Sequence, residues 1–428
     1  MKSIKKLFIK ILRKTNTYNF CKEKYYFCKM EFKYIKTQMD SEHIDDLMKN
    51  DFITDSETIL SYIYSKSDKY INKNKINVAV FPENFISASY YIRLVSPLKE
   101  LSKTGKFKFF IHDNLLDISK INHKCFDIII IQRSFNLNIE NIIKICEKYN
   151  IKIIYETDDD LINLPKKHVD YINYKHRIEN IEILAKNSYL ITVSTPILKK
   201  RYEKYNKDIK IIKNHQIKIL SNKNKHELIK VESSDFNIKE IKIGYFGGDT
   251  HQQDLLILKK PIKNLKKKGL NFQFEVLGTY KEKDLKKYDL ESVINIIEHP
   301  TDDNSRGRFL NFEDFMKLLK KIAISWDIGV CPLLENEFNS GKSELKYIEY
   351  TSLGIPSVLS NVEPYKSIIT DEYNGFLAST SEEWEEKLEK LINNKQLREK
   401  ILSNAILDVE KNYSLKNTVM QWEKILNK

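Results

Sequence analysis

Cations, a carboxylate and small residues gather in the segment from Asp327 to Ser360, DIGVCPLLENEFNSGKSELKYIEYTSLGIPSVLS. Lys342, Lys346 and Glu349 follow the i, i+4, i+7 spacing that puts side chains on one helix face. A helix amino end offers unpaired N–H groups and a partial positive charge, so Gly341, Lys342, Ser343 and Lys346 predict a cradle for a diphosphate. Glu349, one turn deeper, is suited to accept hydrogen bonds from ribose hydroxyls.

A simpler interpretation of the same spacing stays open. An ordinary amphipathic helix would also pair Lys346 with Glu349 at i, i+3 on its surface, and Ser343 would then only cap it. In either case the elements around these residues are predicted alike. An apolar run from Ile328 to Leu333 forms a buried strand, a helix runs from Ser343 to Leu353, and Ser357 to Ser360 forms the next strand. This is a βαβ unit, which binds ligands at the carboxyl edge of its sheet.

Further candidates follow other predicted strands in the same half of the chain. Gly247 and Gly248 end the strand IKIGYF and let a ligand approach the backbone closely. His251 stands at the entry of the next helix, where it contacts a ligand or serves as a helix cap. Gly278 ends the strand FQFEVL, at the edge where a nucleobase would pass.

In the first half, apolar strands such as INVAVF and CFDIIII alternate with helical stretches, which predicts a parallel sheet covered on both faces. Arg133 and the run Asp158, Asp159, Asp160 follow strands of this sheet, and Arg93 lies one turn into the first helix. The arginines suit acceptor or phosphate contacts, or ordinary ion pairs. The aspartates could hold a metal ion, act on an acceptor hydroxyl, or cap the following helix. The absence of G-x-G-x-x-G after the first strand argues against a nicotinamide or flavin enzyme.

Bulk properties limit the class of protein. The chain has 428 residues, enough for two domains, with 41% apolar and 31% charged residues. No apolar run reaches the roughly 20 residues that cross a bilayer, and the basic start has no signal-peptide pattern. Five cysteines without metal-type spacing favour a reducing cytoplasm. The net charge of +13 favours anionic partners without choosing among them.

Residues 1–75 form an extension before the first predicted domain. Apolar residues between Ile4 and Leu12 share one helical face and lysines surround the other, so residues 1–14 either lie on an anionic membrane surface or pack on the protein. The following tract interleaves aromatics with lysines, a pattern that can stack on single-stranded nucleic acid, but no nucleic-acid fold surrounds it. Nucleic acid is therefore not an expected partner.

The motifs DIGVCPL, GKSELKYIEYTSLGIPSVLS, VEPY and NGFLA together resemble the carboxyl-terminal signature of family 4-like glycosyltransferases with the GT-B fold, the glycosyl transferases group 1. That family has two glutamates in an E-x7-E pattern. Glu349 matches the second, which contacts the nucleotide ribose. The first, which contacts the donor sugar, falls on Gly341, where this chain departs from the pattern; Glu335 and Glu337 are candidate replacements.

The resemblance implies an α/β fold of two Rossmann-like domains with parallel sheets, preceded by a helical extension. The expected parts are a basic extension 1–75, an acceptor domain 76–218, a linker 219–240, a nucleotide-sugar domain 241–405, and a helix 406–428 that packs back on the first domain through Trp422 and Ile425. The expected sites are catalytic Asp158, Asp159 and Lys342; donor-binding Gly247, Gly248, His251, Gly278, Gly341, Lys342, Ser343, Lys346 and Glu349; and acceptor-side Arg93 and Arg133.

The implied activity is metal-independent transfer of a hexosyl or related group, with retention, from a UDP-sugar or GDP-sugar to a hydroxyl of a glycan, lipid-linked or protein acceptor. No metal or other cofactor is expected. Surface glycan or glycoconjugate synthesis in the cytoplasm, on the inner face of the plasma membrane, would fit such an enzyme. Because Gly341 replaces a donor-side glutamate, a catalytically silent scaffold that binds sugar nucleotide or an anionic surface is the alternative.

Overall fold

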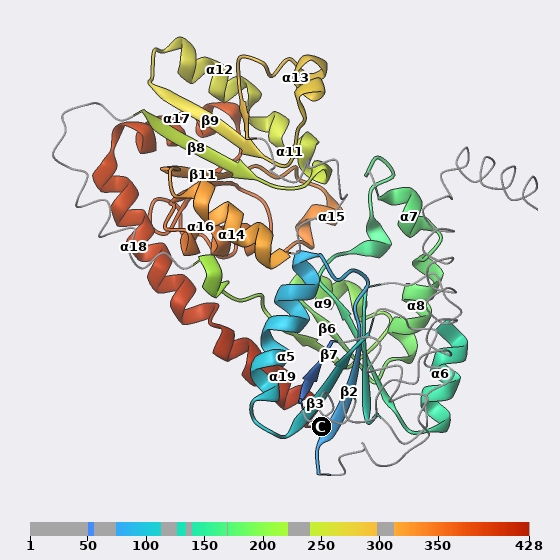
Figure 1. Cartoon of the computed structure of the whole chain (residues 1–428). Coiled ribbons are helices and arrows are strands. Elements are labelled where there is room, and N and C mark those ends of the chain that lie inside the picture. The colour runs from blue at the N-terminus through green and yellow to red at the C-terminus, as the bar shows by residue number, and fades with distance from the viewer. Residues whose placement is uncertain are drawn as a thin grey trace, which may run out of the picture.

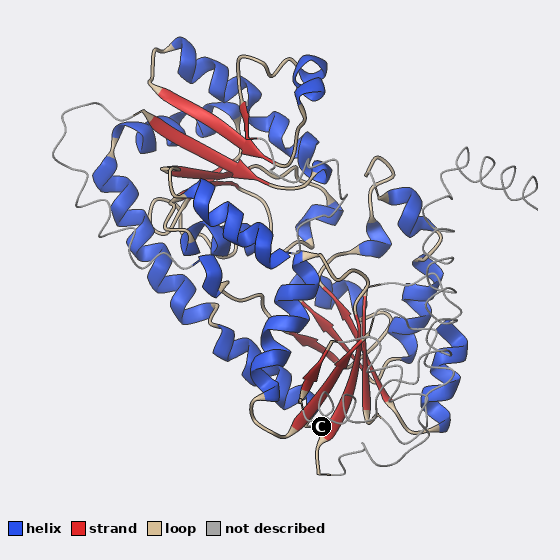
Figure 2. Ribbon diagram, in the orientation of Figure 1, coloured by secondary structure: helices blue, strands red, loops and turns tan. Residues whose placement is uncertain are grey.

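The computed structural model describes residues 50–54, 74–112, 126–133, 139–168, 170–220, 240–297 and 312–427. These residues form two α/β domains, each built on a parallel sheet with helices on its faces, as Figures 1 and 2 show. The predicted fold class of two Rossmann-like domains is thereby confirmed. Residues 1–49 and 55–73 of the predicted helical extension 1–75, and most of the predicted linker, lie outside the described residues.

The N-terminal sheet has the strand order β1-β3-β2-β4-β5-β6-β7, with every neighbouring pair parallel. Its strands are β1 Phe52–Ile53, β2 Ile76–Phe81, β3 Phe107–Ile111, β4 Ile128–Gln132, β5 Lys152–Thr157, β6 Leu190–Val193 and β7 Ile209–Ile211. Runs such as IIIIQ in β4 are buried along their whole length because helices cover both faces of the sheet. The order reverses between β2 and β4, which makes their carboxyl ends the switch point where such sheets bind ligands.

Helical segments connect these strands. They are the π-helix η2 Tyr90–Val95, α5 Ser96–Ser102, α6 Ile139–Lys148, the 3-10 turn η4 Leu161–Asn163, α7 Tyr171–Lys175, α8 Ile178–Asn187, α9 Pro196–Tyr202 and the 3-10 turn η5 Lys218–Leu220. The widened η2 turn is unusual, since π-helical turns are rare and occur frequently at functional sites. It carries Arg93.

Strand β1 corrects one predicted boundary. Phe52 and Ile53 pair with Phe109 and Phe110 of β3, so the first sheet starts before residue 76. A two-residue strand has too little pattern to be found in a sequence, because alternation needs about four residues. The segment 1–75 therefore includes an edge strand of the first domain.

The C-terminal sheet has the order β10-β9-β8-β11-β12-β13, again all parallel. Its strands are β8 Ile241–Phe246, β9 Phe272–Leu277, β10 Asn295–Ile297, β11 Ile328–Cys331, β12 Ser357–Ser360 and β13 Phe376–Ala378. Its helical segments are η6 Asp249–His251, α11 Gln252–Leu255, η7 Leu256–Leu258, α12 Lys259–Lys267, α13 Glu282–Tyr288, α14 Phe312–Ala323, α15 Glu337–Ser340, α16 Leu345–Ser352 and α17 Ser381–Asn393.

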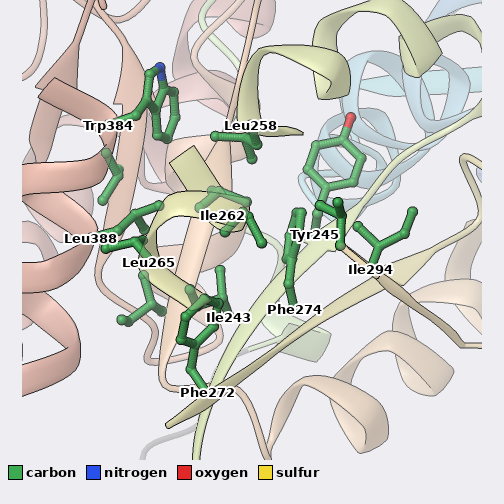
Figure 3. Packing of buried hydrophobic residues seen from close by; sticks show 14 of the residues in the cluster. Ile243, Tyr245, Leu258, Ile262, Leu265, Phe272, Phe274, Ile294, Trp384 and Leu388 are labelled. Atoms are coloured by element: carbon green, nitrogen blue, oxygen red, sulfur yellow. The ribbon is translucent and has the colours of Figure 1, made fainter. Parts of the chain in front are cut away.

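One face of this sheet packs on α12 and α17. Figure 3 shows Leu258, Ile262 and Leu265 interleaved with Trp384 and Leu388 over the strands. A second cluster on the other face includes Trp326, Tyr347 and Tyr350, which fix α14 and α16 to the sheet. The order reverses between β8 and β11, so this sheet too presents a switch point at its carboxyl edge.

The last two helices join the domains. Helix α18, Lys395–Asn412, and helix α19, Leu415–Leu426, run from the upper to the lower domain in Figure 1. Trp422 and Ile425 lie in the hydrophobic cluster formed by β2, β3 and α5 of the N-terminal domain, as predicted from the sequence. The predicted boundary at residue 405 falls inside α18. In the described part of the chain, no helix combines the length and the apolar character needed to span a bilayer.

Candidate active site

A cavity of about 920 Å³ lies between the carboxyl edges of the two sheets. It is the size of a typical pocket for a small-molecule ligand or cofactor. The residues predicted from sequence that line it are Arg93, Arg133, Asp158, Asp159, Gly247, Gly248, His251, Gly278, Lys342, Ser343, Lys346 and Glu349. Residues more than 250 positions apart in sequence are therefore brought to one site, most of them at a strand exit or near a helix start.

The turn before α16 departs in part from the predicted cradle. Helix α16 begins at Leu345 with Glu344 as its N-cap residue, two positions later than predicted. The N–H groups of Gly341 and Lys342 donate to the carbonyl oxygens of Phe338 and Asn339, at 3.1 and 3.0 Å, because α15 ends there. These two amides are thus already used, and the contribution of this turn to the cavity comes from the side chains of Lys342 and Ser343.

The structure places Gly341 outside the diphosphate cradle predicted from the sequence. It is absent from the cavity lining and packs on helix α9 of the other domain. An added Cβ would lie 3.0 Å from Nη1 of Arg201 and 3.2 Å from Leu198. The proposed replacements for the missing glutamate fail too, since Glu335 and Glu337 are exposed and do not line the cavity.

Glu349 is a buried carboxylate whose partner is a cation of its own helix. Nζ of Lys346 lies 2.9 Å from its Oε2 and 3.3 Å from the ring centroid of Phe246, a cation–π contact. Burial raises the pKa of Glu349, and Lys346 offsets this only in part. The simpler interpretation predicts an i, i+3 pair between Lys346 and Glu349. This pair does form, but it faces the cavity and not the protein surface.

Gly247 and Gly278, which follow the ends of strands β8 and β9, form the opposite wall of the cavity. Gly278 has φ +90°, a conformation that favours glycine, and an added Cβ would come within 2.7 Å of the Gly247 carbonyl oxygen. That oxygen also accepts a hydrogen bond of 3.1 Å from Thr279. The β8 and β9 exits are therefore held in contact, with backbone atoms open to the cavity.

His251 stands beside these exits, and its Nδ1 lies 2.8 Å from Asp254. Burial lowers the pKa of His251; the hydrogen bond to Asp254 acts the other way, and the charge of Lys342 lowers it further. His251 forms no side-chain cap. The imidazole is therefore neutral at pH 7 and lines the cavity as a hydrogen-bonding group.

On the N-terminal side, Arg133 organises the acidic run. Its Nε donates to Asp158 at 2.9 Å and its Nη2 to Asp159 at 2.6 Å, and its backbone φ of +60° turns the side chain back toward them. Burial raises the pKa of Asp158, but the charge and hydrogen bond of Arg133 outweigh burial and lower it. Asp160 does not cap the next turn with its side chain; it pairs with Arg201.

Arg93 is 1% exposed and lies under the cavity floor. Its Nε donates to Glu156 at 2.7 Å, and its Nη1 contacts the Ile212 carbonyl oxygen and Asn214 Oδ1. Its Nη2 is buried without a hydrogen-bond partner among the described residues. A buried guanidinium with one unused donor is costly unless a ligand supplies the acceptor.

Sequence reasoning missed several lining residues. Asn214, Lys281 and Lys283 line the cavity. Asn214 follows β7 and the two lysines follow β9, so the rule that polar residues beyond strand carboxyl ends meet at one edge would have found them. No comparable local signal marks Arg201, since its partners come from both domains.

Comparison with known proteins finds a family model that matches most of the second domain. The family model described as glycosyl transferases group 1 matches residues 240–394. No curated protein sequence matches the chain.

Solved structures support the fold over most of the chain. HepE of Anabaena in complex with UDP and glucose is 12% identical, with a TM-score of 0.55 over 82% of this chain and 99% of that one. A glycosyltransferase from Rickettsia africae is 14% identical, with a TM-score of 0.54 over 83% and 98%. S. aureus TarM is 15% identical with a TM-score of 0.47, and this chain covers 55% of its length. At these identities the likeness to the Anabaena and Rickettsia structures shows the fold alone.

Proposed function

Since the chain has the GT-B fold and its second domain belongs to the glycosyl transferases group 1 family, we propose that it transfers a hexosyl or related group from a UDP-sugar to a hydroxyl acceptor in the cavity between the domains. The observation that carries this proposal is the placement of Lys342 and Glu349. The sequence predicts that Lys342 contacts a diphosphate and that Glu349 contacts a ribose. Both residues line the same cavity between two parallel sheets.

The donor side is the C-terminal domain. Glu349 accepts hydrogen bonds from the ribose hydroxyls. Gly247 and Gly278, which follow the ends of β8 and β9, leave room for the base and the diphosphate. Uracil is the base we favour, because the Anabaena protein of the same fold is described in complex with UDP and glucose. Lys342 is less engaged than Lys346: its Nζ lies 4.0 Å from Asp159, against 2.9 Å between Lys346 and Glu349. The charge of Lys342 is therefore available to a diphosphate.

The reaction requires a new bond between the acceptor oxygen and the anomeric carbon, while the bond from that carbon to the diphosphate oxygen breaks. The electron pair leaves with the diphosphate, whose charge Lys342 and the amino end of α16 stabilise. Asp158, with its lowered pKa, is a poor proton acceptor and orients the acceptor hydroxyl. The proton then passes to the departing diphosphate oxygen, on the same face of the sugar, which fits retention.

The acceptor side is the N-terminal domain, where the unused Nη2 of Arg93 is a donor for an oxygen of the acceptor. Asp158 and Asp159 are occupied by Arg133, so a metal ion would have to displace a guanidinium. We therefore expect turnover to persist in EDTA. Loss of turnover in EDTA with recovery on adding a divalent cation would contradict metal independence.

The test of the reaction is release of free nucleoside diphosphate. The full chain is incubated with a panel of UDP-sugars and GDP-sugars, with and without glycan acceptors, and free UDP or GDP is measured. We expect slow donor hydrolysis with at least one UDP-sugar, and Lys342→Ala should abolish it. The exposed Lys267→Ala serves as the control for net charge.

A silent scaffold is the second candidate, since Gly341, Glu335 and Glu337 all lie outside the cavity lining and none of them supplies the donor-side glutamate. It predicts UDP binding without hydrolysis or transfer across the whole donor panel. Turnover of any donor would exclude it.

The setting we propose is glycan or glycoconjugate synthesis at the cytoplasmic face of a membrane. Residues 1–14, on which the membrane contact rests, lie outside the described residues. Co-sedimentation with vesicles of anionic phospholipid should fall when residues 1–14 are deleted. Equal sedimentation of the full and the shortened chain would exclude this contact.

A further inference from the structure

The turn that carries Lys342 is held by the opposite domain. Nη2 of Arg201, on α9, donates to Ser340 Oγ at 2.8 Å, and Oγ1 of Thr195 donates to the Gly341 carbonyl oxygen at 3.2 Å. Nδ2 of Asn214, which follows β7, donates to Ser343 Oγ at 2.8 Å. Residues 340, 341 and 343 therefore each accept a hydrogen bond from the N-terminal domain.

Each of the three donors is fixed within its own domain. Thr195 is the N-cap residue of α9 and also accepts from the Leu198 N–H at 3.2 Å. Arg201 pairs through Nη1 with Asp160, which is 1% exposed. Asn214 accepts from Nη1 of Arg93 at 3.2 Å. The three donors are therefore anchored in the N-terminal domain, and they meet the turn from outside its own domain.

This arrangement also gives Gly341 a role. A side chain at 341 would crowd this contact, because a Cβ there would lie 3.0 Å from Nη1 of Arg201 and 3.2 Å from Leu198, so both side chains would have to shift. A glutamate there would have to displace Arg201 from the interface. The departure from the E-x7-E pattern and the contact between domains are thus two consequences of one residue.

We propose that Thr195, Arg201 and Asn214 are positioning residues for the donor site: they hold turn 340–343 so that Lys342 faces the diphosphate. The grip of the C-terminal domain on a nucleoside diphosphate then depends on the N-terminal domain being closed against it. Arg201, which belongs to the N-terminal domain, lies close to the space that a side chain at position 341 would need. The identity of the ligand rests on the proposed function, whereas the contact between the domains does not.

The test uses two measurements on the full chain. The first is amide hydrogen exchange of residues 337–343 without any ligand, and the second is UDP affinity by calorimetry. Ser340→Ala removes the acceptor of Arg201 while leaving the Arg201–Asp160 pair intact. It also removes the hydrogen bond of 2.8 Å that Ser340 Oγ donates to the Glu337 carbonyl oxygen within α15, so Thr195→Val, which leaves that bond in place, decides the exchange result. We expect faster exchange in α15 and UDP affinity lowered about 3-fold to 10-fold, less than the direct loss of one hydrogen bond from a charged donor, because the turn acts on UDP through Lys342.

Matched variants sharpen the result. Thr195→Val should act like Ser340→Ala, whereas Thr195→Ser keeps the hydroxyl and should behave as wild type. Lys200→Ala, an exposed change on the same helix, should alter neither measurement. In a double-mutant cycle, Arg201→Ala combined with Ser340→Ala should weaken UDP binding no more than Arg201→Ala alone.

Two failures are distinguishable. If Ser340→Ala and Thr195→Val leave both the exchange of residues 337–343 and UDP affinity at wild-type values, the positioning role is wrong. If the wild-type chain binds no UDP or GDP, the proposed function fails, while the exchange measurement still decides whether the N-terminal domain holds the turn.

Discussion

At the scale of single residues, the two lysines of the donor site do different work. Lys346 neutralises Glu349 and lies on Phe246, so it is part of the folded structure. Lys342 lies 4.8 Å from the Phe338 ring and only approaches Asp159, so it retains charge for a ligand. The same residue type at i and i+4 therefore has two separate roles.

Substitution of these lysines should separate the roles. Lys342→Ala should lower UDP affinity about 10-fold or more, because a charge-assisted contact to phosphate is lost, without a change in stability. Lys346→Ala should instead lower the free energy of unfolding by about 3 kcal/mol, since Glu349 is left buried and unpaired. Calorimetry with UDP and urea unfolding measure the two effects. Equal stability loss in both variants would contradict this division.

The pH dependence of UDP binding should report on Glu349. If its carboxylate accepts the ribose hydroxyls, protonation competes with binding, so affinity falls as pH drops through the raised pKa, above the ordinary glutamate value of about 4.3. UDP also titrates, so the quantity to follow is the ratio of wild-type to Glu349→Gln affinity. This ratio should be largest at neutral pH and approach one in acid. A ratio that stays constant from neutral pH down through the acid range would remove Glu349 from the ribose site.

Sequence was informative at this scale where a role depends on local spacing. Lys346 and Glu349 could be placed on one face because a helix repeats every 3.6 residues, whereas the amino end of the helix was placed two residues early, at Ser343. Gly341 was misplaced because its environment is set by Leu198 and Arg201, more than 130 residues earlier in the chain. Contacts between domains leave no periodic trace, and Arg201 was missed for that reason.

At the scale of elements, the strands were the most predictable. Near-continuous apolar runs mark β2 and β4, because a strand buried on both faces has no polar side. The π-helix η2 was not predictable, since a helix and its widened turn share the same apolar pattern. It matters for the site because it sets the direction of Arg93 from beneath the cavity.

The unit β11, α16, β12 positions the donor residues through very close packing. The ring of Tyr350, on α16, lies over Gly329 of β11, where an added Cβ would be 2.5 Å from it. Oη of Tyr350 also lies 3.0 Å from the Gly244 carbonyl oxygen of β8. The height of α16 above the sheet, and with it the position of Glu349, therefore depends on a glycine in the strand.

Gly329→Ala should move α16 away from the sheet. We expect a loss of about 1–3 kcal/mol in the free energy of unfolding from overpacking, together with weaker UDP binding because Glu349 shifts. Urea unfolding and calorimetry provide the measurements. For stability alone, Gly248→Ala is the matched control, since its nearest atom would be 3.8 Å away. Similar stability losses in both variants would show that α16 does not rest on Gly329.

At the scale of the whole molecule, the chain crosses between the domains twice at one place. The Gln216 N–H donates to the Tyr413 carbonyl oxygen at 2.7 Å, and Thr418 Oγ1 donates to the Lys213 carbonyl oxygen at 3.3 Å. The segment that leaves the first domain and the segment that returns to it are thus bound together. Motion between the domains has to pass through this pair of crossings, which makes them the natural hinge.

The return of α19 makes the stability of the first domain depend on the end of the chain. Trp422 is fully buried among N-terminal residues, and its Nε1 donates to the Arg93 carbonyl oxygen at 3.1 Å. Trp422→Ala should cost about 3–5 kcal/mol, from the lost apolar burial and the cavity left behind. Met420→Ala, an exposed change on the same helix, should cost less than about 0.5 kcal/mol.

The form of the unfolding curve is the stronger test of this dependence. If α19 completes the core of the first domain, that domain cannot keep its stability once Trp422 is lost, while the second domain, whose core clusters do not include Trp422, is unaffected. Urea unfolding of Trp422→Ala, followed by hydrogen exchange in β2 and in β8, should then show β2 exposed at lower urea than β8. Because Trp422 also holds the backbone of Arg93, turnover should fall at urea concentrations where β8 is still protected. Simultaneous exposure of β2 and β8 in the variant would mean that α19 merely covers the first domain.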